Sequence, residues 1–140
     1  MKLEDKELLL RDLCGRLPYG VKVKTLIKEP YTLKGLFDTE YGGVMGCLLG
    51  KFVPNNISPK TVNYPLEQFK PYLFPLSSMT EEQYGEYTDM GYSITERWWS
   101  MANYHQIDWC NKNHFDYRGL IEKGLAIDAT GLNIYKEETE

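Results

Sequence analysis

The middle of the chain decides the fold, because it carries the stretch Phe69-Lys-Pro-Tyr-Leu-Phe-Pro-Leu-Ser-Ser-Met79. Pro71 and Pro75 bracket Tyr72-Leu-Phe74, which leaves room for one short strand with apolar side chains on both faces. The sequence before this stretch is typical of short strands punctuated by glycine, and the sequence after it is typical of helices. We therefore expect the stretch to be buried where a sheet meets a set of helices.

The part before it, residues 1–76, predicts one helix followed by a small sheet. Leucines recur with helical spacing from Leu3 to Leu17, and Pro18 ends this helix. The segment from Pro65 to Pro71 indicates one 3₁₀ turn before the last strand of this part. Short, bent strands with such a turn resemble SH3-like small barrels. The period-two segments place strands at 20–27, 31–38, 44–50 and 61–64, with Gly35 at a bulge.

The part after it, residues 77–140, predicts helices that are acidic and rich in aromatic residues. Thr80 and Gln83 have the spacing of a capping box, so a helix begins there. A longer helix is predicted from Thr95 to about Lys112. Further predictions are a short helix at 117–123 that is capped by Asp116 and ends at Gly124, and short strands or extended arms at 125–129 and 132–135.

These elements predict an α+β protein. An N-terminal helix packs on a small, bent, antiparallel SH3-like sheet, and a helical C-terminal part follows and shares its core. The two parts, 1–76 and 77–140, are expected to form one compact unit, because 140 residues suit a single domain.

Charge is distributed unevenly along the chain, whose net charge is −4. Residues 1–70 carry 11 Lys and Arg against 8 Asp and Glu, whereas residues 71–140 carry 5 against 12. The first part is too weakly basic for its charge alone to indicate nucleic-acid binding. The second part would attract basic surfaces.

Cysteine usage and hydropathy indicate a cytoplasmic protein. The three cysteines, Cys14, Cys47 and Cys110, are odd in number and far apart, which argues against a disulfide framework. No stretch reaches the roughly 18 apolar residues of a membrane span, and the charged N-terminus lacks the apolar core of a signal peptide. We therefore expect a bacterial cytoplasmic location and no contact with a membrane.

Three stretches that together span most of the chain carry a resemblance to a family, which residues 28–63 match less well. They are Asp12-Leu-Cys-Gly-Arg-Leu-Pro-Tyr-Gly-Val-Lys-Val23, Phe69 to Gln83, and Asn113-His-Phe-Asp-Tyr-Arg-Gly-Leu-Ile-Glu-Lys-Gly-Leu-Ala126. They resemble small uncharacterised proteins encoded in the genomes and phages of gut Bacteroidetes. The resemblance implies a cytoplasmic protein of a mobile element or its host, and it implies no particular activity.

No motif indicates catalysis or a cofactor. His105, Cys110 and His114 could suggest a metal site, but a step of five residues on a helix turns two side chains well apart. Cys14 or Cys47 could pair with a histidine as a nucleophile, although nothing in the sequence brings them together and buried, inert thiols are the simpler interpretation. Phosphate-binding, dinucleotide-binding and zinc-protease motifs are absent. We therefore expect no metal, no cofactor and no enzymatic activity.

Aromatic residues of the C-terminal half are candidates for a partner-binding surface. Trp98 and Trp99 point about 100° apart on a helix, so either the helix is covered on two sides or one Trp is exposed. The cluster His114 to Arg118 has the composition of an interaction hot spot, and it could equally dock one element onto another. The candidate partner-binding residues are Trp99, Tyr104, Asp116, Tyr117 and Arg118.

Lysines on the first two strands are candidates for an alternative function. Lys22, Lys24, Lys28 and Lys34, with Tyr31 nearby, could bind single-stranded nucleic acid. They could also simply keep a sheet soluble and protect its edges. The sequence thus favours a non-enzymatic interaction protein of phage or mobile-element type that binds a basic surface of a host or phage protein through its acidic C-terminal half. A nucleic-acid-binding module is the alternative.

Overall fold

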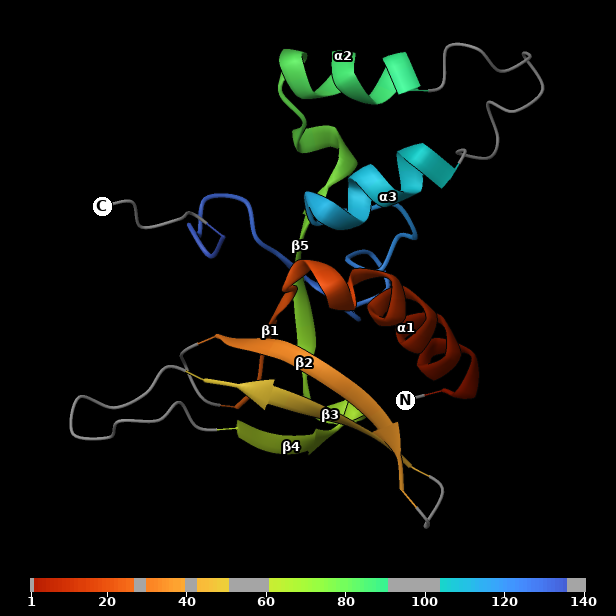
Figure 1. Cartoon of the computed structure of the whole chain (residues 1–140), viewed down its shortest axis with the longest axis vertical. Helices are drawn as coiled ribbons and strands as arrows, with labels where there is room; N and C mark the ends of the chain where they lie inside the picture. The colour runs from red at the N-terminus through yellow and green to blue at the C-terminus, as the bar shows by residue number, and fades with distance from the viewer. Residues whose placement is uncertain (1, 27–29, 40–42, 51–60, 91–103, 136–140) are drawn as a thin grey trace.

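The computed structural model describes residues 2–26, 30–39, 43–50, 61–90 and 104–135. The protein has an α+β fold, and its described residues form one N-terminal helix, a mixed sheet and two further helices that are arranged along one long axis (Figure 1). The helices are α1 (Leu3–Arg16), α2 (Glu81–Met90) and α3 (Tyr104–Lys112). The strands are β1 (Lys22–Lys24), β2 (Tyr31–Asp38), β3 (Val44–Leu49), β4 (Thr61–Pro65), β5 (Lys70–Pro75), β6 (Phe115–Asp116) and β7 (Ile127–Asp128).

The sheet has the strand order β4-β3-β2-β1-β5-β6, and β7 also pairs with β5. The pairs from β4 to β5 are all antiparallel, and the register of β2 and β3 shifts between Leu33 and Gly35. The 3₁₀ turn Leu66–Gln68 (η2) lies between β4 and β5. The bulge at Gly35 and the 3₁₀ turn are therefore confirmed, whereas the resemblance to SH3-like barrels stays a prediction.

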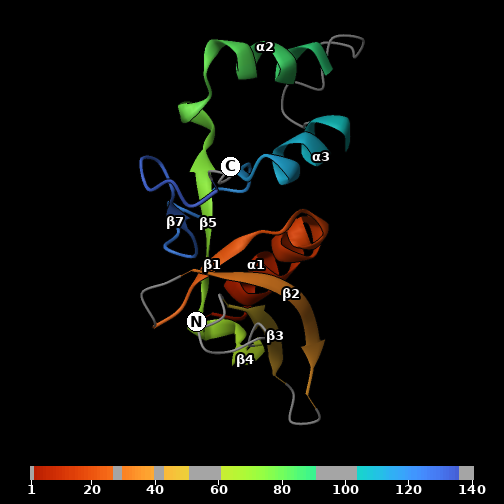
Figure 2. The same ribbon diagram turned by 60° about the vertical axis from the view of Figure 1, so that its left-hand side comes forward.

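Strand β5 joins the two parts of the protein, as the central stretch predicted. It pairs antiparallel with β1, with Val23 opposite Pro71, and it pairs in parallel with β6 and β7 from the C-terminal part. Pro71, Tyr72 and Leu73 are buried. Both views of the ribbon show β5 running from the sheet to the helical end (Figures 1 and 2). The sheet is thus antiparallel up to β5 and becomes mixed only where the C-terminal part joins it.

Helix α1 packs on the inner face of the sheet. Its acidic first turn, which contains Glu4 and Asp5, suits the positive end of the helix dipole, and Pro18 ends it in a 3₁₀ turn. Leu9 and Leu13 are fully buried. They belong to one apolar cluster that includes residues from both parts of the chain, namely Val21, Val23, Leu33, Leu48, Leu66, Phe69, Leu73, Leu120, Leu125 and Ala126.

Two predictions for the C-terminal part were wrong. Residues 117–123 form turns rather than a helix, because Gly119 has a φ of 76°, which a right-handed helix does not allow. Gly124 has the expected left-handed conformation. Residues 132–135 form bends rather than a strand or an extended arm, and Asn133 has a left-handed φ of 58°. The first half of the helix predicted from Thr95 lies outside the described residues.

Gly46 provides a test of packing in the core. A Cβ atom at this position of β3 would lie 2.6 Å from Cζ of Phe69 and 3.2 Å from Cδ1 of Leu33, and both side chains are 1% exposed. We expect Gly46→Ala to lower the free energy of unfolding by about 1–3 kcal/mol, as overpacking does, in urea unfolding experiments.

Gly35→Ala is the matched control. A Cβ atom at Gly35 would meet only Cβ of Cys47, at 3.8 Å. This variant is expected to change the free energy of unfolding by no more than about 0.5 kcal/mol, or to raise it slightly by restricting the unfolded chain. Equal losses in the two variants would contradict the close packing of Phe69 on β3.

Candidate functional site

The helical end of the protein begins with a well-defined helix start. The Thr80 N–H donates to Oε1 of Gln83 over 2.9 Å, and the Gln83 N–H donates to Oγ1 of Thr80 over 3.1 Å. This is the capping box that the sequence predicted. Just before it, the hydroxyl of Ser78 donates to the carbonyl of Pro75 at the end of β5. The direction in which α2 leaves β5 is therefore set by local hydrogen bonds.

Helix α2 is held against α3 by Trp109. The Trp109 ring stacks on Phe115, with ring centroids 5.4 Å apart, and also contacts Tyr87 at 5.8 Å. Its indole N–H donates to a carboxylate oxygen of Glu86, and Gln106 donates to the carbonyl of Tyr87. The Tyr87–Trp109 contact and these two hydrogen bonds thus connect α2 to α3, and the Phe115 stack connects α3 to β6.

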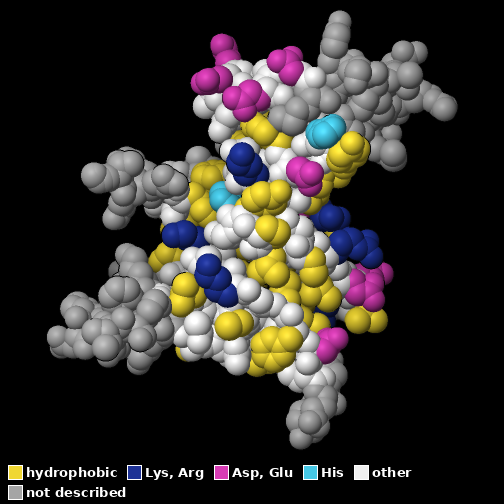
Figure 3. All heavy atoms as spheres, in the orientation of Figure 1, with side chains coloured by type: hydrophobic (Ala, Val, Ile, Leu, Met, Phe, Trp, Pro, Cys, Tyr) yellow, Lys and Arg dark blue, Asp and Glu magenta, His cyan; other side chains and the backbone are white. Residues whose placement is uncertain are grey.

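We call α2 and α3 together the acidic end. Its acidic residues are Glu81, Glu82, Glu86, Asp89 and Asp108, and Lys112 is the only Lys or Arg in the two helices, which gives a net charge of −4. Figure 3 shows acidic side chains gathered over α2, at the end farthest from β2, β3 and β4. Tyr84 is 61% exposed and Tyr104 is 70% exposed. Exposed tyrosines within a concentrated negative field are typical of a surface that binds a basic partner.

The structure places Tyr104 on this surface, but it places Asp116, Tyr117 and Arg118 elsewhere. Asp116 is 8% exposed, and its carboxylate accepts the backbone N–H groups of Arg118, Leu120 and Ile121 over 3.0–3.2 Å. The Tyr117 hydroxyl donates to Oδ1 of Asn111. These three side chains form contacts inside the protein. This agrees with the second interpretation of the cluster, in which it docks one element onto another. Trp98 and Trp99 lie outside the described residues.

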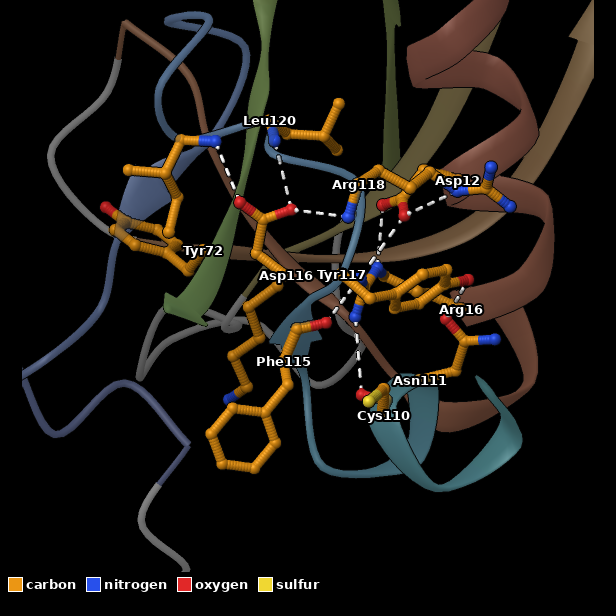
Figure 4. A network of polar contacts seen from close by, with 12 residues as sticks. Asp12, Arg16, Tyr72, Cys110, Asn111, Phe115, Asp116, Tyr117, Arg118 and Leu120 are labelled. Atoms are coloured by element: carbon orange, nitrogen blue, oxygen red, sulfur yellow. Dashed lines mark hydrogen bonds and ion pairs between the residues drawn. The ribbon is translucent and has the colours of Figure 1, made fainter. Parts of the chain in front are cut away.

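Asp12 and Arg16 of α1 form the centre of this internal network, and both are 0% exposed (Figure 4). Arg16 donates to both carboxylate oxygens of Asp12, over 2.7 and 3.2 Å, and also to the carbonyl of Phe115 over 2.6 Å and that of Cys110 over 3.5 Å. Nε of Arg118 lies 3.2 Å from Asp12. The guanidinium groups of both arginines lie about 5 Å from the Tyr117 ring centroid. The network therefore attaches α1 to the end of α3 and to β6.

This network is not predictable from the sequence. Leu9, Asp12, Leu13 and Arg16 are spaced for one helix face, so the two polar residues share the buried face with the two leucines. An Asp and an Arg four residues apart are more often solvated, and nothing in the sequence distinguishes the two cases.

The histidines and Cys110 do not come together as a metal site. His105 is exposed on α3, whereas His114 stacks on Tyr135 with ring centroids 3.7 Å apart. Burial raises the pKa of the Cys110 thiol to about 12, so this thiol is protonated and a poor nucleophile at neutral pH. Among the described residues, no three His, Cys, Asp or Glu side chains are grouped closely enough to bind a metal ion.

Three lysines of the alternative hypothesis, Lys22, Lys24 and Lys34, lie on the outer face of the sheet, but Tyr31 does not. Tyr31 is opposite Val23 on the inner face, where it packs against the apolar core. Lys22 and Lys24 alternate with Val23 and so project to the other face, and Lys34 is exposed. The structure thus separates the lysines from the aromatic ring that was expected to join them. Lys28 lies outside the described residues.

No protein-family model matches the chain, and neither a curated protein nor a solved structure shows significant similarity to it. None of the helices in the described part of the chain has the length and apolar character needed to cross a membrane.

Proposed function

We propose that this protein is a non-enzymatic interaction protein that binds a basic surface of another protein through its acidic end. The observation that carries the proposal is the charge of this end, where five acidic side chains and one basic side chain lie on two packed helices. The helices are joined to the rest of the protein through β5 and β6, so the surface of α2 is presented at one tip of the molecule (Figure 2).

Charge and exposed tyrosines have different roles in such an interaction. The negative field speeds association with a basic partner and selects against acidic ones, an effect that salt weakens. Tyr84 and Tyr104 supply large, amphipathic contact areas, which account for much of the binding energy at many interfaces. The partner is therefore expected to combine Lys or Arg side chains with an apolar patch.

The sequence, rather than the geometry of the acidic end, indicates which organism or phage the partner comes from. The three stretches that resemble proteins of Bacteroidetes and their phages support a host or phage protein as the partner. The absence of a recognised catalytic motif in the sequence supports a role in binding rather than in catalysis.

Removal of charge from α2 tests the proposal. The protein is used to capture partners from a lysate of the cells that encode it, and affinity for an identified basic partner is then measured by calorimetry. We expect the triple variant Glu81→Gln, Glu82→Gln, Asp89→Asn to bind about tenfold more weakly, since each exposed charge pair contributes roughly 0.2–1 kcal/mol. Tyr84→Ser should weaken binding by a similar factor.

The matched control removes three exposed acidic charges elsewhere. Glu4→Gln, Glu7→Gln, Glu122→Gln changes the net charge equally and, like the test variant, neutralises a residue in the first turn of a helix. Glu86 is left unchanged because it accepts the hydrogen bond of Trp109. Equal weakening by both triple variants would contradict a specific role for the acidic end. Steeply salt-dependent binding to DNA would favour the nucleic-acid alternative instead.

A further inference from the structure

A pocket of about 410 Å³ lies where the end of β1, the η2 turn and the start of β5 meet, close to β7. Its volume is within the range of small-molecule binding sites. The pocket adjoins Lys70 at the first residue of β5, whereas α2 follows the other end of that strand. It is therefore separate from the acidic end, and an inference about it does not depend on the function proposed above.

The apolar part of the pocket combines buried and exposed side chains. Phe69 borders the pocket but is 1% exposed, so it supports the wall from the core and offers a ligand little surface. Ile127 of β7 is half-buried and adds a wall. Leu26 is 90% exposed and lines the pocket, so its apolar side chain is free to contact a bound molecule.

The polar part of the pocket is positively charged. Lys24 and Lys70 are directly opposite each other on β1 and β5, both are exposed, and both line the pocket. Like charges in this position destabilise a sheet unless an anion lies between them. Within the part of the chain that the structure describes, neither lysine forms an ion pair.

Glu67, the acidic residue that lines the pocket, does not neutralise these lysines. Its carboxylate lies 2.5 Å from Nζ of Lys6 on α1. The hydrogen bond from Lys6 is the main reason that the pKa of Glu67 is lowered. The charge of Glu67 is thus largely balanced by α1, and the pocket retains an excess of positive charge.

We propose that this pocket binds a small amphipathic anion, whose carboxylate, sulfonate or phosphate group lies between Lys24 and Lys70 and whose aromatic or acyl body lies against Leu26 and Ile127. The apolar surface supplies affinity for the body, and the two ammonium groups select a negatively charged head. A neutral molecule of the same shape would gain only the first of these contributions.

Two fluorescent probes that share an apolar body test this selectivity in the full-length protein. 1-Anilinonaphthalene-8-sulfonate carries a sulfonate, whereas N-phenyl-1-naphthylamine is its uncharged counterpart. We expect the anionic probe to bind at least about tenfold more tightly, because hydrogen bonds to charged groups are among the stronger polar contacts. Laurate should displace it, whereas dodecanol should displace it less effectively.

Variants then assign the effect to the pocket. Lys24→Gln with Lys70→Gln should weaken binding of the anionic probe about tenfold and leave the neutral probe unchanged. Lys34→Gln with Lys123→Gln is the matched control, because both lysines are exposed and neither lines the pocket. Leu26→Ser should weaken binding of both probes, and its exposure makes the change harmless to folding.

Two results would overturn the proposal. The first is equal affinity for the two probes, or equal effects of the two lysine pairs, because the site would then not select an anion. The second is displacement of the anionic probe by a single-stranded oligonucleotide with steep salt dependence and no displacement by laurate, since the lysines would then serve nucleic-acid binding.

Discussion

Replacing Arg16 with Met is expected to lower the free energy of unfolding by about 3–5 kcal/mol, the usual cost of breaking a buried ion pair by removing one partner. Arg16 and Asp12 are both 0% exposed, so water cannot replace the lost guanidinium. The carboxylate of Asp12 would retain only Arg118, and the carbonyl groups of Cys110 and Phe115 would lose their donor. Urea unfolding followed by circular dichroism measures the loss.

Lys6→Met is the matched control for this variant. Lys6 also pairs with one carboxylate, that of Glu67, but both side chains are 40% exposed. Surface pairs of this kind contribute at most about 1 kcal/mol. The loss of unfolding free energy for Arg16→Lys should lie between those for Lys6→Met and Arg16→Met. Lysine keeps the positive charge but lacks the planar guanidinium group that reaches Asp12 and a carbonyl group together. A loss for Arg16→Met no greater than that for Lys6→Met would contradict a structural role for the network.

The same network shows where prediction from the sequence reached its limit. The leucine spacing of residues 3–17 predicted α1 and its end at Pro18, because both depend on local periodicity and backbone sterics. The burial of Asp12 and Arg16 depends on residues about 100 positions away, whose carbonyl groups Arg16 contacts. No local pattern contains that information.

The C-terminal part shows a second limit. The capping box at Thr80 was predictable because its two hydrogen bonds join residues three apart. Asp116 was predicted to cap a helix, and it does accept several backbone N–H groups, but these belong to a turn that Gly119 bends away from helical geometry. A capping residue thus indicates a group of N–H donors without deciding how the chain continues beyond them.

The acidic surface could be predicted from the sequence, whereas the exposed aromatic residues and the pocket could not, because these depend on contacts between distant parts of the chain. Charge is a property of composition, so the acidic character of the C-terminal half could be recognised from the sequence, and the structure gathers part of it on α2. Which aromatic side chains are exposed depends on packing. Trp109 is covered by Tyr87 and Phe115, whereas Tyr84 and Tyr104 are not buried. The pocket at Lys24 and Lys70 requires the pairing of β1 with β5, which no local motif encodes.

His114 gives the protein a pH-dependent stability. Its ring stacks on Tyr135, whose hydroxyl accepts the N–H of Lys22 and donates to the carbonyl of Tyr72. Its Nδ1 atom is buried and has no hydrogen-bond partner among the described residues. Burial, assisted by the positive charges of Arg16 and Lys22, lowers the pKa of His114 from 6.5 to about 4. The folded protein therefore keeps this imidazole neutral down to about pH 4.

The unfolded chain binds a proton at His114 below its ordinary pKa of 6.5, whereas the folded protein does not. The contribution of His114 to stability is thus fully present above pH 6.5 and is lost as the pH falls toward 4. The full shift corresponds to about 3 kcal/mol, and partial exposure of the ring reduces this to about 2 kcal/mol. Urea unfolding at intervals between pH 7.5 and pH 4 measures the decline.

His114→Asn removes the titrating group and keeps a residue that tolerates the left-handed φ of 66° at this position. This variant is less stable at neutral pH, because the stacking on Tyr135 is lost, but its stability should change little between pH 6.5 and pH 4.5. The exposed residue His105 is the matched control, and His105→Asn should retain the full decline. Carboxylates such as Asp128 and Glu67, whose pKa values are lowered by hydrogen bonds, titrate in all three proteins and cancel in the comparison. A decline in His114→Asn as steep as in the unchanged protein would show that another group is responsible.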